Sequence, residues 1–169
     1  SSTAAATFRH PSSGAAYTSL SQHPMDPHQV SVGTADGEVA SLDLRSDAAK
    51  VLSSAQAHDG DVLCVRHHPV TPAYCFTGGI DGSVVLLEGT AAGSYNVEVL
   101  GTCGEGIHAL DVNAASNAVV GATRGERFVL VQGLEQTSAG SKYSFQAAAT
   151  ASALAPSTLP DIDMSMISS

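Results

Sequence analysis

Short apolar runs, separated by Pro, Gly and Asp residues, dominate the central part of the chain. The runs 62–65, 74–77, 84–87 and 95–100 are rich in β-branched and aromatic residues and are too short for helices. Pro69 and Pro72 lie between the first two runs, where proline removes a backbone donor and favours a turn. No convincing helical periodicity occurs before residue 134. The pattern predicts four short antiparallel strands.

The same pattern occurs earlier in the chain, displaced by 45 residues. Strands are expected at 30–32, 39–44 and 50–52. The displacement needs no gap and aligns eight identical pairs: His23/His68, Pro24/Pro69, Pro27/Pro72, Gly33/Gly78, Asp36/Asp81, Gly37/Gly82, Val39/Val84 and Leu42/Leu87. An internal repeat of this period is the first feature to look for in a solenoid or propeller.

A third, weaker copy follows. The segment 121–125 lies 43 residues after 78–82, which aligns Leu130 with Leu87, and the segment 110–112 is expected to be the preceding strand. In the first two copies an Asp-Gly pair (Asp36-Gly37, Asp81-Gly82) predicts a hairpin turn, because glycine tolerates a positive φ. Four strands per unit at this period predict a β-propeller blade. A β-sandwich would not give a repeat with matched turns.

Composition and charge argue against two classes of function. The chain has 169 residues, 43% of them hydrophobic, with no Trp and a net charge of −9 from 16 acidic and 7 basic residues. Scattered Lys and Arg residues cannot neutralise a nucleic-acid backbone, so direct nucleic-acid binding is not expected. Direct membrane insertion is not expected either, because no apolar run approaches the roughly 20 residues of a membrane span. Three cysteines form no disulfide framework and indicate a reducing compartment.

These motifs resemble the WD40 family. Ala57-His58 stands for the Gly-His pair of that family and Asp81-Gly82 for its Asp-containing turn, while Leu42-Asp43 and Leu87-Glu88 stand at the Trp-Asp position. The resemblance implies a buried hydrogen-bonded network of His58, Thr77 and Asp81, in which Leu87 replaces the Trp. The expected blade motif comprises His58, Thr77, Asp81, Gly82, Asp36, Gly37, His23 and His68.

The fold expected from this resemblance is all-β: about three blades of a larger, seven-bladed WD40-type β-propeller. The blades are expected at about 17–57, 58–101 and 102–133. Residues 134–169 are expected to form an Ala/Ser-rich tail, disordered or marginally helical. The chain lacks an initiator Met, and we expect it to begin inside a longer protein, or another chain to complete the ring.

Residues 17–131 also resemble the C-terminal blades of the WD40 nucleoporins in the Y-shaped outer-ring complex of the nuclear pore. This resemblance implies a scaffold at the nuclear envelope of the nucleus, with the other Y-complex subunits as protein partners, that supports nucleocytoplasmic transport of protein and mRNA. The alternative is another WD40 adaptor, such as the substrate receptor of a ubiquitin ligase or a targeting-signal receptor. A third possibility, an enzymatic propeller, would need convergent carboxylates or histidines, and the sequence shows none in register.

Three other patterns could carry chemistry. Cys64, His67, His68 and Cys75 have a spacing that could suit zinc, but His68-Pro69 repeats as His23-Pro24 in a unit without cysteines, which favours a structural role. His58, Asp81 and Ser83 could form a catalytic triad, although the blade network explains the first two. The Gly-rich segment 101–106 lacks the Lys of a phosphate-binding loop. We therefore expect no catalytic residues, no metal and no cofactor.

Acidic residues gather in the first two units and could form a surface for a basic partner. They are Asp26, Asp36, Asp43, Asp47, Asp59 and Asp61. Solvated loops are the plainer interpretation. The segment 161–166 could be a short docking motif.

Overall fold

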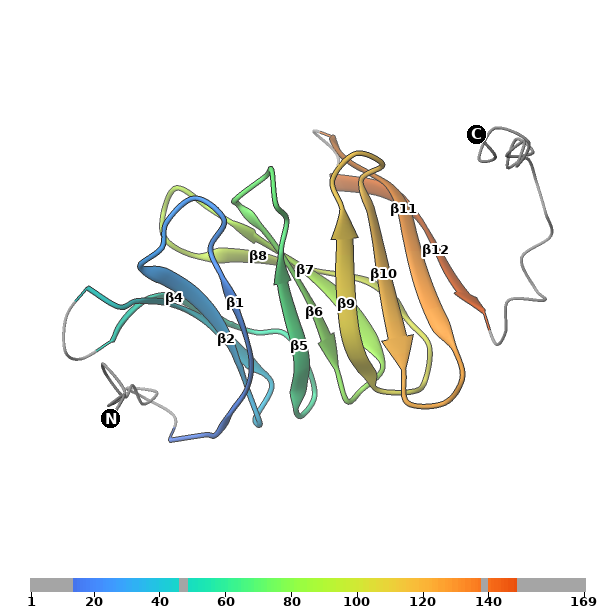
Figure 1. Ribbon diagram of the computed structural model, residues 1–169, viewed down its shortest axis with the longest axis horizontal. Coiled ribbons are helices and arrows are strands. Elements are labelled where there is room, and N and C mark those ends of the chain that lie inside the picture. The colour runs from blue at the N-terminus through green and yellow to red at the C-terminus, as the bar shows by residue number, and fades with distance from the viewer. Residues whose placement is uncertain (1–13, 46–48, 138–139, 149–169) are drawn as a thin grey trace, which may run out of the picture.

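The computed structural model describes residues 14–45, 49–137 and 140–148. Within these ranges the chain folds into three four-stranded antiparallel sheets (Figure 1), which confirms the all-β prediction. The first sheet contains β1 (Tyr17–Gln22), β2 (Gln29–Thr34), β3 (Glu38–Asp43) and β4 (Lys50–Gln56). The second contains β5 (Val62–His67), β6 (Tyr74–Gly79), β7 (Ser83–Gly89) and β8 (Tyr95–Thr102). The third contains β9 (Ile107–Asn113), β10 (Ala118–Thr123), β11 (Phe128–Thr137) and β12 (Gly140–Ala148).

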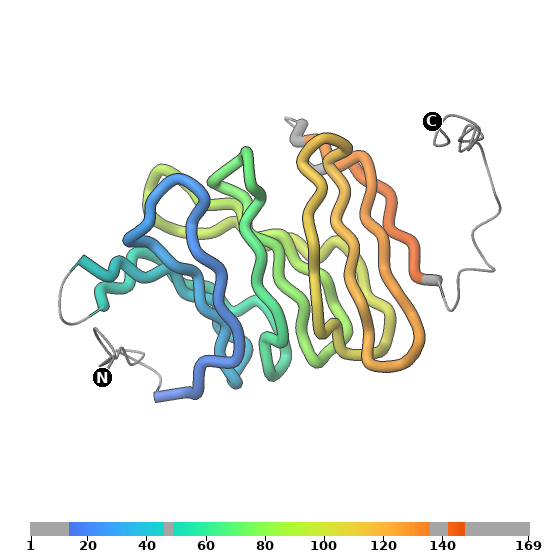
Figure 2. The backbone as a smooth tube through the Cα atoms, in the orientation of Figure 1, coloured from blue at the N-terminus to red at the C-terminus, as the bar shows by residue number. Residues whose placement is uncertain are grey.

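The three sheets lie face to face in chain order (Figure 2). The first strands of the sheets are neighbours, since β1 contacts β5 and β5 contacts β9. The fourth strands lie at the opposite edge, where β4 meets β8 and β8 meets β12. Each sheet keeps sequential strand order, so the chain completes one sheet before starting the next. No described helix is long and apolar enough to cross a membrane.

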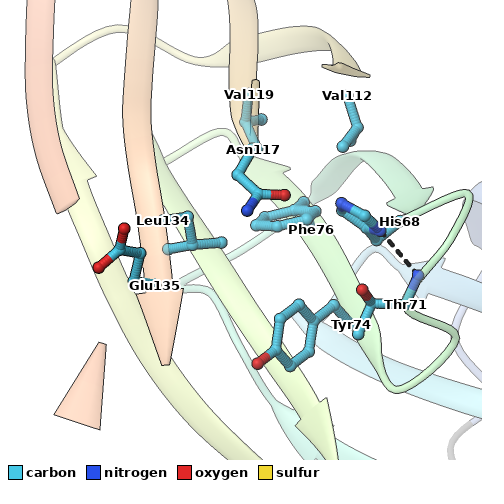
Figure 3. Close-up of a pocket in the computed structure, with 9 residues that line it drawn as sticks. All are labelled: His68, Thr71, Tyr74, Phe76, Val112, Asn117, Val119, Leu134 and Glu135. Atoms are coloured by element: carbon cyan, nitrogen blue, oxygen red, sulfur yellow. Dashed lines mark hydrogen bonds between the residues drawn. The ribbon is translucent and has the colours of Figure 1, made fainter. Parts of the chain in front are cut away.

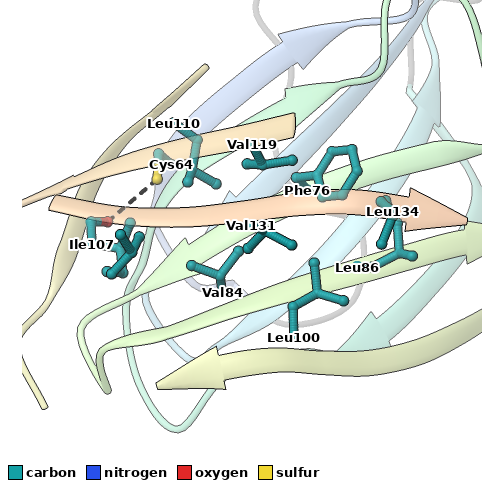
Figure 4. Close-up of a cluster of buried hydrophobic side chains, with 11 residues drawn as sticks. Cys64, Phe76, Val84, Leu86, Leu100, Ile107, Leu110, Val119, Val131 and Leu134 are labelled. Atoms are coloured by element: carbon teal, nitrogen blue, oxygen red, sulfur yellow. Dashed lines mark hydrogen bonds between the residues drawn. The ribbon is translucent and has the colours of Figure 1, made fainter. Parts of the chain in front are cut away.

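The apolar side chains of the described sheets fill the spaces between them. Between the second and third sheets, Phe76, Leu86 and Leu100 meet Leu110, Val119 and Val131 (Figure 4). Between the first and second sheets, Val39 of β3 packs against Val62, Val65, Cys75 and Leu87. A third cluster on the first sheet is built on Val32, Ala40 and Leu42. The second sheet has apolar side chains on both faces, and each face is covered by a neighbouring sheet.

Two glycines determine how closely the sheets approach. A Cβ atom on Gly33 of β2 would lie 2.5 Å from a Val62 methyl carbon, and one on Gly78 of β6 would lie 2.6 Å from Ile107. Val62 and Ile107 are the residues that open β5 and β9. At both junctions, a branched side chain of the following sheet therefore occupies the space left by a glycine of the preceding one.

The alignment of the third copy is wrong by one residue. Val65 pairs with Thr77 in the second sheet, and Leu110, 45 residues later, pairs with Gly121 in the third. Gly121 therefore corresponds to Thr77 rather than to Gly78, and the true displacement over β10 is 44. Val85 and Val129 agree, because they pair with Thr77 and Gly121 respectively.

The corrected register explains which side chains of β10 and β11 are buried. Successive residues of a strand face opposite sides, so a one-residue slip exchanges the two faces. Val119 is 1% exposed in the core and Val120 is 44% exposed. Likewise Val131, not Leu130, takes the position of Leu87.

The third sheet continues beyond the boundary expected at residue 133. The prediction of a disordered or helical tail from 134 is wrong for its first part, because β11 runs to Thr137 and pairs with β12. The sequence Lys-Tyr-Ser-Phe-Gln at 142–146 alternates polar and aromatic residues, a strand pattern. Tyr143 and Phe145 pack on the core shared with the second sheet. Residues 149–169, including the possible docking motif at 161–166, lie outside the described residues.

Candidate functional site

His58 lies in the connection from β4 to β5 and joins two sheets. Its backbone N–H donates to the carbonyl oxygen of Gly37, 3.2 Å away in the β2–β3 turn. Its ring instead enters the second sheet, where the side chain has no exposed surface. Gly37 has a φ of 88°, and a Cβ atom there would lie 2.0 Å from the carbonyl oxygen of His58. The glycine thus permits both the hairpin turn and the approach of the connection.

Both ring nitrogens of His58 have partners. Nε2 lies 2.8 Å from Oγ1 of Thr77 on β6, and Nδ1 lies 2.8 Å from Oγ of Ser83 on β7. The two carboxylate oxygens of Asp81 lie 3.2 and 3.3 Å from Nδ1. The structure therefore brings together the three residues expected to form the network and adds Ser83.

The positions of these partners differ from those in a catalytic triad. In a triad the hydroxyl and the carboxylate contact opposite ring nitrogens. Here Ser83 and Asp81 share Nδ1, Ser83 Oγ donates to Asp81 Oδ1 at 2.7 Å, and Thr77 occupies Nε2. Since Ser83 is 6% exposed, the arrangement leaves neither nitrogen free to activate it toward an external substrate.

The environment favours a neutral ring beside a charged carboxylate. Burial lowers the pKa of His58, and the opposing effect of Asp81 only reduces that shift. For Asp81, burial acts to raise the pKa, but hydrogen bonds from the backbone and hydroxyl of Ser83 and from the backbone of Asp59 hold it below its usual value. The network stabilises this corner of the second sheet.

A glycine makes room for the histidine. A Cβ atom on Gly79 would lie 2.4 Å from the His58 ring and 2.7 Å from Asp81. Thr34 and Thr123 occupy the same position in the other sheets, since all three pair with the first residue of the inner strand.

Among the described residues, the two threonines close their turns without a histidine. Thr34 Oγ1 donates to Asp36 and to the carbonyl oxygen of Glu38. In the third sheet, Thr123 Oγ1 donates to Glu105, 3.0 Å away, and Cys103 occupies the position of His58 with its N–H on the Gly82 carbonyl. Gly82, with φ of 77°, forms the hairpin turn of the second sheet. In the first sheet, this turn arrangement could have been recognised in the sequence from Thr34, whose hydroxyl stands two positions before the Asp36-Gly37 pair.

His23 and His68 organise another turn, between the first two strands of their sheets. Nδ1 of His68 accepts the N–H groups of Val70 and Thr71, and Nδ1 of His23 accepts those two and three residues further on in the same way. In the third sheet Asn113 Oδ1 accepts the corresponding pair of N–H groups. Asn113 lies 45 residues after His68, a correspondence that the identity-based comparison missed.

The residues with zinc-like spacing do not converge. Cys64 belongs to the core shared with the third sheet, while Cys75 belongs to the core shared with the first. Burial raises the pKa of Cys64 to about 11 and of Cys75 to about 12, so both remain protonated thiols. His67 Nε2 contacts Ser31 and His68 caps its turn. No group of three potential metal ligands gathers within the described ranges.

The acidic residues divide between two ends of the sheets. Asp26 and Asp43 hold Arg45 at 2.6 and 2.9 Å. Asp36 and Asp59 lie instead at the ends where the β2–β3 turn and the β4–β5 connection meet. Asp47 lies outside the described residues.

Comparison with known proteins gives a match only in structure. No protein-family model and no curated protein sequence matches the chain. The crystal structure of Saccharomyces cerevisiae Sqt1, a WD40 protein, matches with a TM-score of 0.69 at 12% identity, over 85% of this chain and 38% of that one. The chain thus spans less than half the length of Sqt1. It has the fold of a partial WD40-type β-propeller. The three sheets are therefore blades, and the His58 network is a corner of the second blade.

Proposed function

We propose that the chain is a protein-binding scaffold of the WD40 adaptor type. The observation that carries this proposal is that the His58 network is satisfied within the blade: both ring nitrogens contact blade residues and Ser83 is buried, although the network lines one wall of a cavity of about 380 Å³. The grouping most like a catalytic site is thus part of the structural framework. Propellers without catalytic groups present their faces and edges to other proteins, and the fold match supports such a role.

At a finer level, we propose a scaffold subunit of the outer-ring Y complex of the nuclear pore, located at the nuclear envelope. The support is the ordered motif resemblance over residues 17–131. Both Asp-Gly turns and both His-Pro pairs that contribute to it have a defined place in the blades. The partners would be other Y-complex subunits, and the role in protein and mRNA transport would be indirect.

Affinity capture tests both levels. The tagged chain, expressed in eukaryotic cells, should recover Y-complex subunits and give a rim signal at the nuclear envelope. The matched control is Val119→Lys, which places a charge in the core shared by the second and third blades and should abolish specific capture. Recovery of a cullin and its linker would instead favour the ubiquitin-ligase receptor and contradict the pore assignment. Failure to recover any stable partner would contradict the scaffold itself.

A further inference from the structure

The outer strands of the first two blades leave apolar side chains exposed where the blades face each other. β4 contacts β8 at this edge of the molecule. Val97 and Val99 of β8 are 44% and 54% exposed, and Leu52 of β4 is 40% exposed. Val97 pairs with Leu87, which packs toward the first blade, so Val97 and Val99 lie on that same face of the second blade. We call the place where β4 and β8 face each other the outer junction.

A cavity lies at each end of the outer junction. The first, of about 290 Å³, is lined by Leu52 at the start of β4 and Tyr95 at the start of β8, among others. The second, which we call the His58 cavity, has a volume of about 380 Å³, and its lining includes Ala57 and Val99. The exposed apolar side chains of β8 thus lead from one cavity to the other.

Phe145 of β12 fills the corresponding place between the second and third blades. It pairs with Val131 as Val97 pairs with Leu87, and Val131 and Leu87 are equivalent positions of their blades. Phe145 and Val97 are therefore equivalent as well. A Cβ atom on Gly101 would lie 2.3 Å from the Phe145 ring, so the ring lies directly against β8. One junction thus holds a phenyl ring where the other holds only an isopropyl group.

β4 offers a phenyl ring nearly the same surface as β8. Ala55 pairs with Val39 as Gly101 pairs with Val84, and Val39 and Val84 are aligned by the repeat. Ala55 therefore stands at the position of Gly101 and differs from it by one methyl group. Because the side chain of valine is much smaller than that of phenylalanine, Val97 leaves open part of the space that a ring would take. The exposure of Val97 follows from this difference.

The His58 cavity places negative charge beside the open position. Asp59 and Asp81 line it, and its described lining contains no Lys or Arg. Asp59 is exposed and takes part in none of the ion pairs formed among residues 14–45, 49–137 and 140–148. Burial lowers the pKa of His58, so the neutral ring does not offset the carboxylates at pH 7. A cationic group is therefore favoured at this end of the outer junction.

The cavity of about 410 Å³ between the second and third blades lacks this combination (Figure 3). Polar side chains, among them His68 and Asn117, line it beside Phe76. Its one described carboxylate, on Glu135, lies directly across the β11–β12 ladder from Lys142, which offsets the charge. An open apolar position next to unpaired negative charge is thus a feature of the outer junction and not of this cavity.

We propose that the outer junction docks an extended segment of a partner protein that carries a phenylalanine with a Lys or Arg two positions away. The ring lies between Ala55 and Val97, the place that Phe145 fills in the next junction, and the cationic group meets Asp59. The spacing follows from β8, because Val99, two residues beyond Val97, lines the same cavity as Asp59. An extended segment advances by the same distance, about 3.3 Å per residue. This proposal rests on the protein-binding function and names one place where that binding occurs.

The test titrates the isotope-labelled full chain with the capped peptide Gly-Lys-Ser-Phe-Ser-Lys-Gly and follows methyl and amide NMR signals. Lys on both sides places a cation two residues from the ring whichever way the segment runs. Saturable shifts should centre on Leu52, Val97 and Val99, with a Kd of roughly 1 mM or below. Replacing the Phe of the peptide by Ser should abolish the shifts, and replacing both Lys by Glu should weaken binding at least fivefold. Shifts confined to the cavity of Figure 3, or shifts that do not saturate, would overturn the proposal.

Val97→Phe tests the location, because it supplies the side chain that the third blade carries at the equivalent position. The variant should lose binding of the Phe peptide, with an unfolding midpoint unchanged or raised. Val120→Phe is the matched control: Val120 is also 44% exposed but lies on β10, and this variant should bind the peptide as the unsubstituted chain does. Peptide binding that survives Val97→Phe would refute the docking site.

A charge reversal tests the cationic half of the recognition. Asp59→Lys should abolish the preference for the Lys peptide over the Glu peptide. Glu126→Lys should keep that preference, because Glu126 is equally exposed but lies in the β10–β11 turn, outside the lining of the His58 cavity. An unchanged preference in Asp59→Lys would refute the role of the carboxylate. If affinity capture succeeds while the peptide fails to bind, the docking site falls and the scaffold function stands.

Discussion

At the residue scale, the histidine of the second blade depends on a glycine as much as on its hydrogen bonds. His58 has partners on both ring nitrogens, yet its ring fits only because Gly79 carries no side chain. The first and third blades have threonine at this position and no histidine network at the corner that the structure describes. The two positions therefore form one unit, although they are 21 residues apart in the sequence.

Gly79→Ala should destabilise the chain by about 1–3 kcal/mol, because the new methyl group overlaps the His58 ring within a packed interior. Urea denaturation measures the loss. Gly89→Ala is the matched control, since the nearest atom to its Cβ is 3.7 Å away and its effect should stay within about 0.5 kcal/mol. Equal effects of the two substitutions would contradict the packing explanation.

His67 should make stability depend on pH between about 6.5 and 4. Burial first, and the neighbouring His23 second, lower its pKa to about 4, so the unfolded state binds the proton more readily. Stability is then fully present above pH 6.5 and falls as the pH is lowered toward 4, by about 2–3 kcal/mol for this group.

The variant His67→Gln should flatten that part of the stability curve, as measured by urea midpoints at successive pH values. His108→Gln removes an exposed imidazole and should leave the slope unchanged. A slope that persists in His67→Gln would show that other groups dominate, among them His58 and His68, whose pKa values burial also lowers.

At the element scale, the sequence predicted the strands of the first two blades except β1, and those of the third blade less well. Repeated His-Pro and Asp-Gly pairs fixed the register of the first two, because each pair has a turn to form. In the third blade Asn113 replaces the histidine, so matching identities favoured a displacement of 43 instead of 44. The strand β12 was missed because its Ala-rich flank outweighed the alternation at 142–146. The cavities between blades could not be predicted, because they depend on how neighbouring blades meet.

The corrected register gives a direct comparison of two adjacent valines. Val119→Thr should cost about 1–3 kcal/mol, because it places a hydroxyl in the core, whereas Val120→Thr on the exposed face should change stability by less than about 0.5 kcal/mol. Both changes keep a β-branched side chain, so strand propensity is matched. Thermal or urea unfolding measures the difference. If Val120→Thr cost more stability than Val119→Thr, the result would support a displacement of 43 instead of 44.

At the scale of the whole molecule, the second blade is the element on which both junctions depend. Its two faces carry separate cores, one with Cys75 toward the first blade and one with Cys64 toward the third. The reactivity of Cys75 therefore indicates whether the first blade is packed on the second, and the reactivity of Cys64 indicates whether the third blade is packed on it.

In the native chain at pH 8, Cys103 should be alkylated first, and Cys64 and Cys75 should react only when the blades separate. Cys103 is half-buried, whereas the other two are buried and have pKa values raised to about 11 and about 12. Mass spectrometry after timed iodoacetamide treatment resolves the three sites. In urea above the unfolding midpoint, all three should react at similar rates. Native alkylation of Cys64 or Cys75 as fast as Cys103 would contradict the described packing.

The pairing of His58 with Gly79 also limits the mutational routes by which one blade could come to resemble another. For the third blade to acquire the same corner, Cys103 would have to become histidine and Thr123 glycine, and Gly121, which stands at the position of Thr77, would have to gain a hydroxyl. Histidine arriving first would collide with the threonine, and glycine arriving first would delete the hydroxyl that bonds Glu105. The effect of each substitution therefore depends on whether the other is already present, which is a case of epistasis. Drift by single substitutions therefore tends to keep the three corners distinct, and the histidine network spreads most readily by duplication of a whole blade.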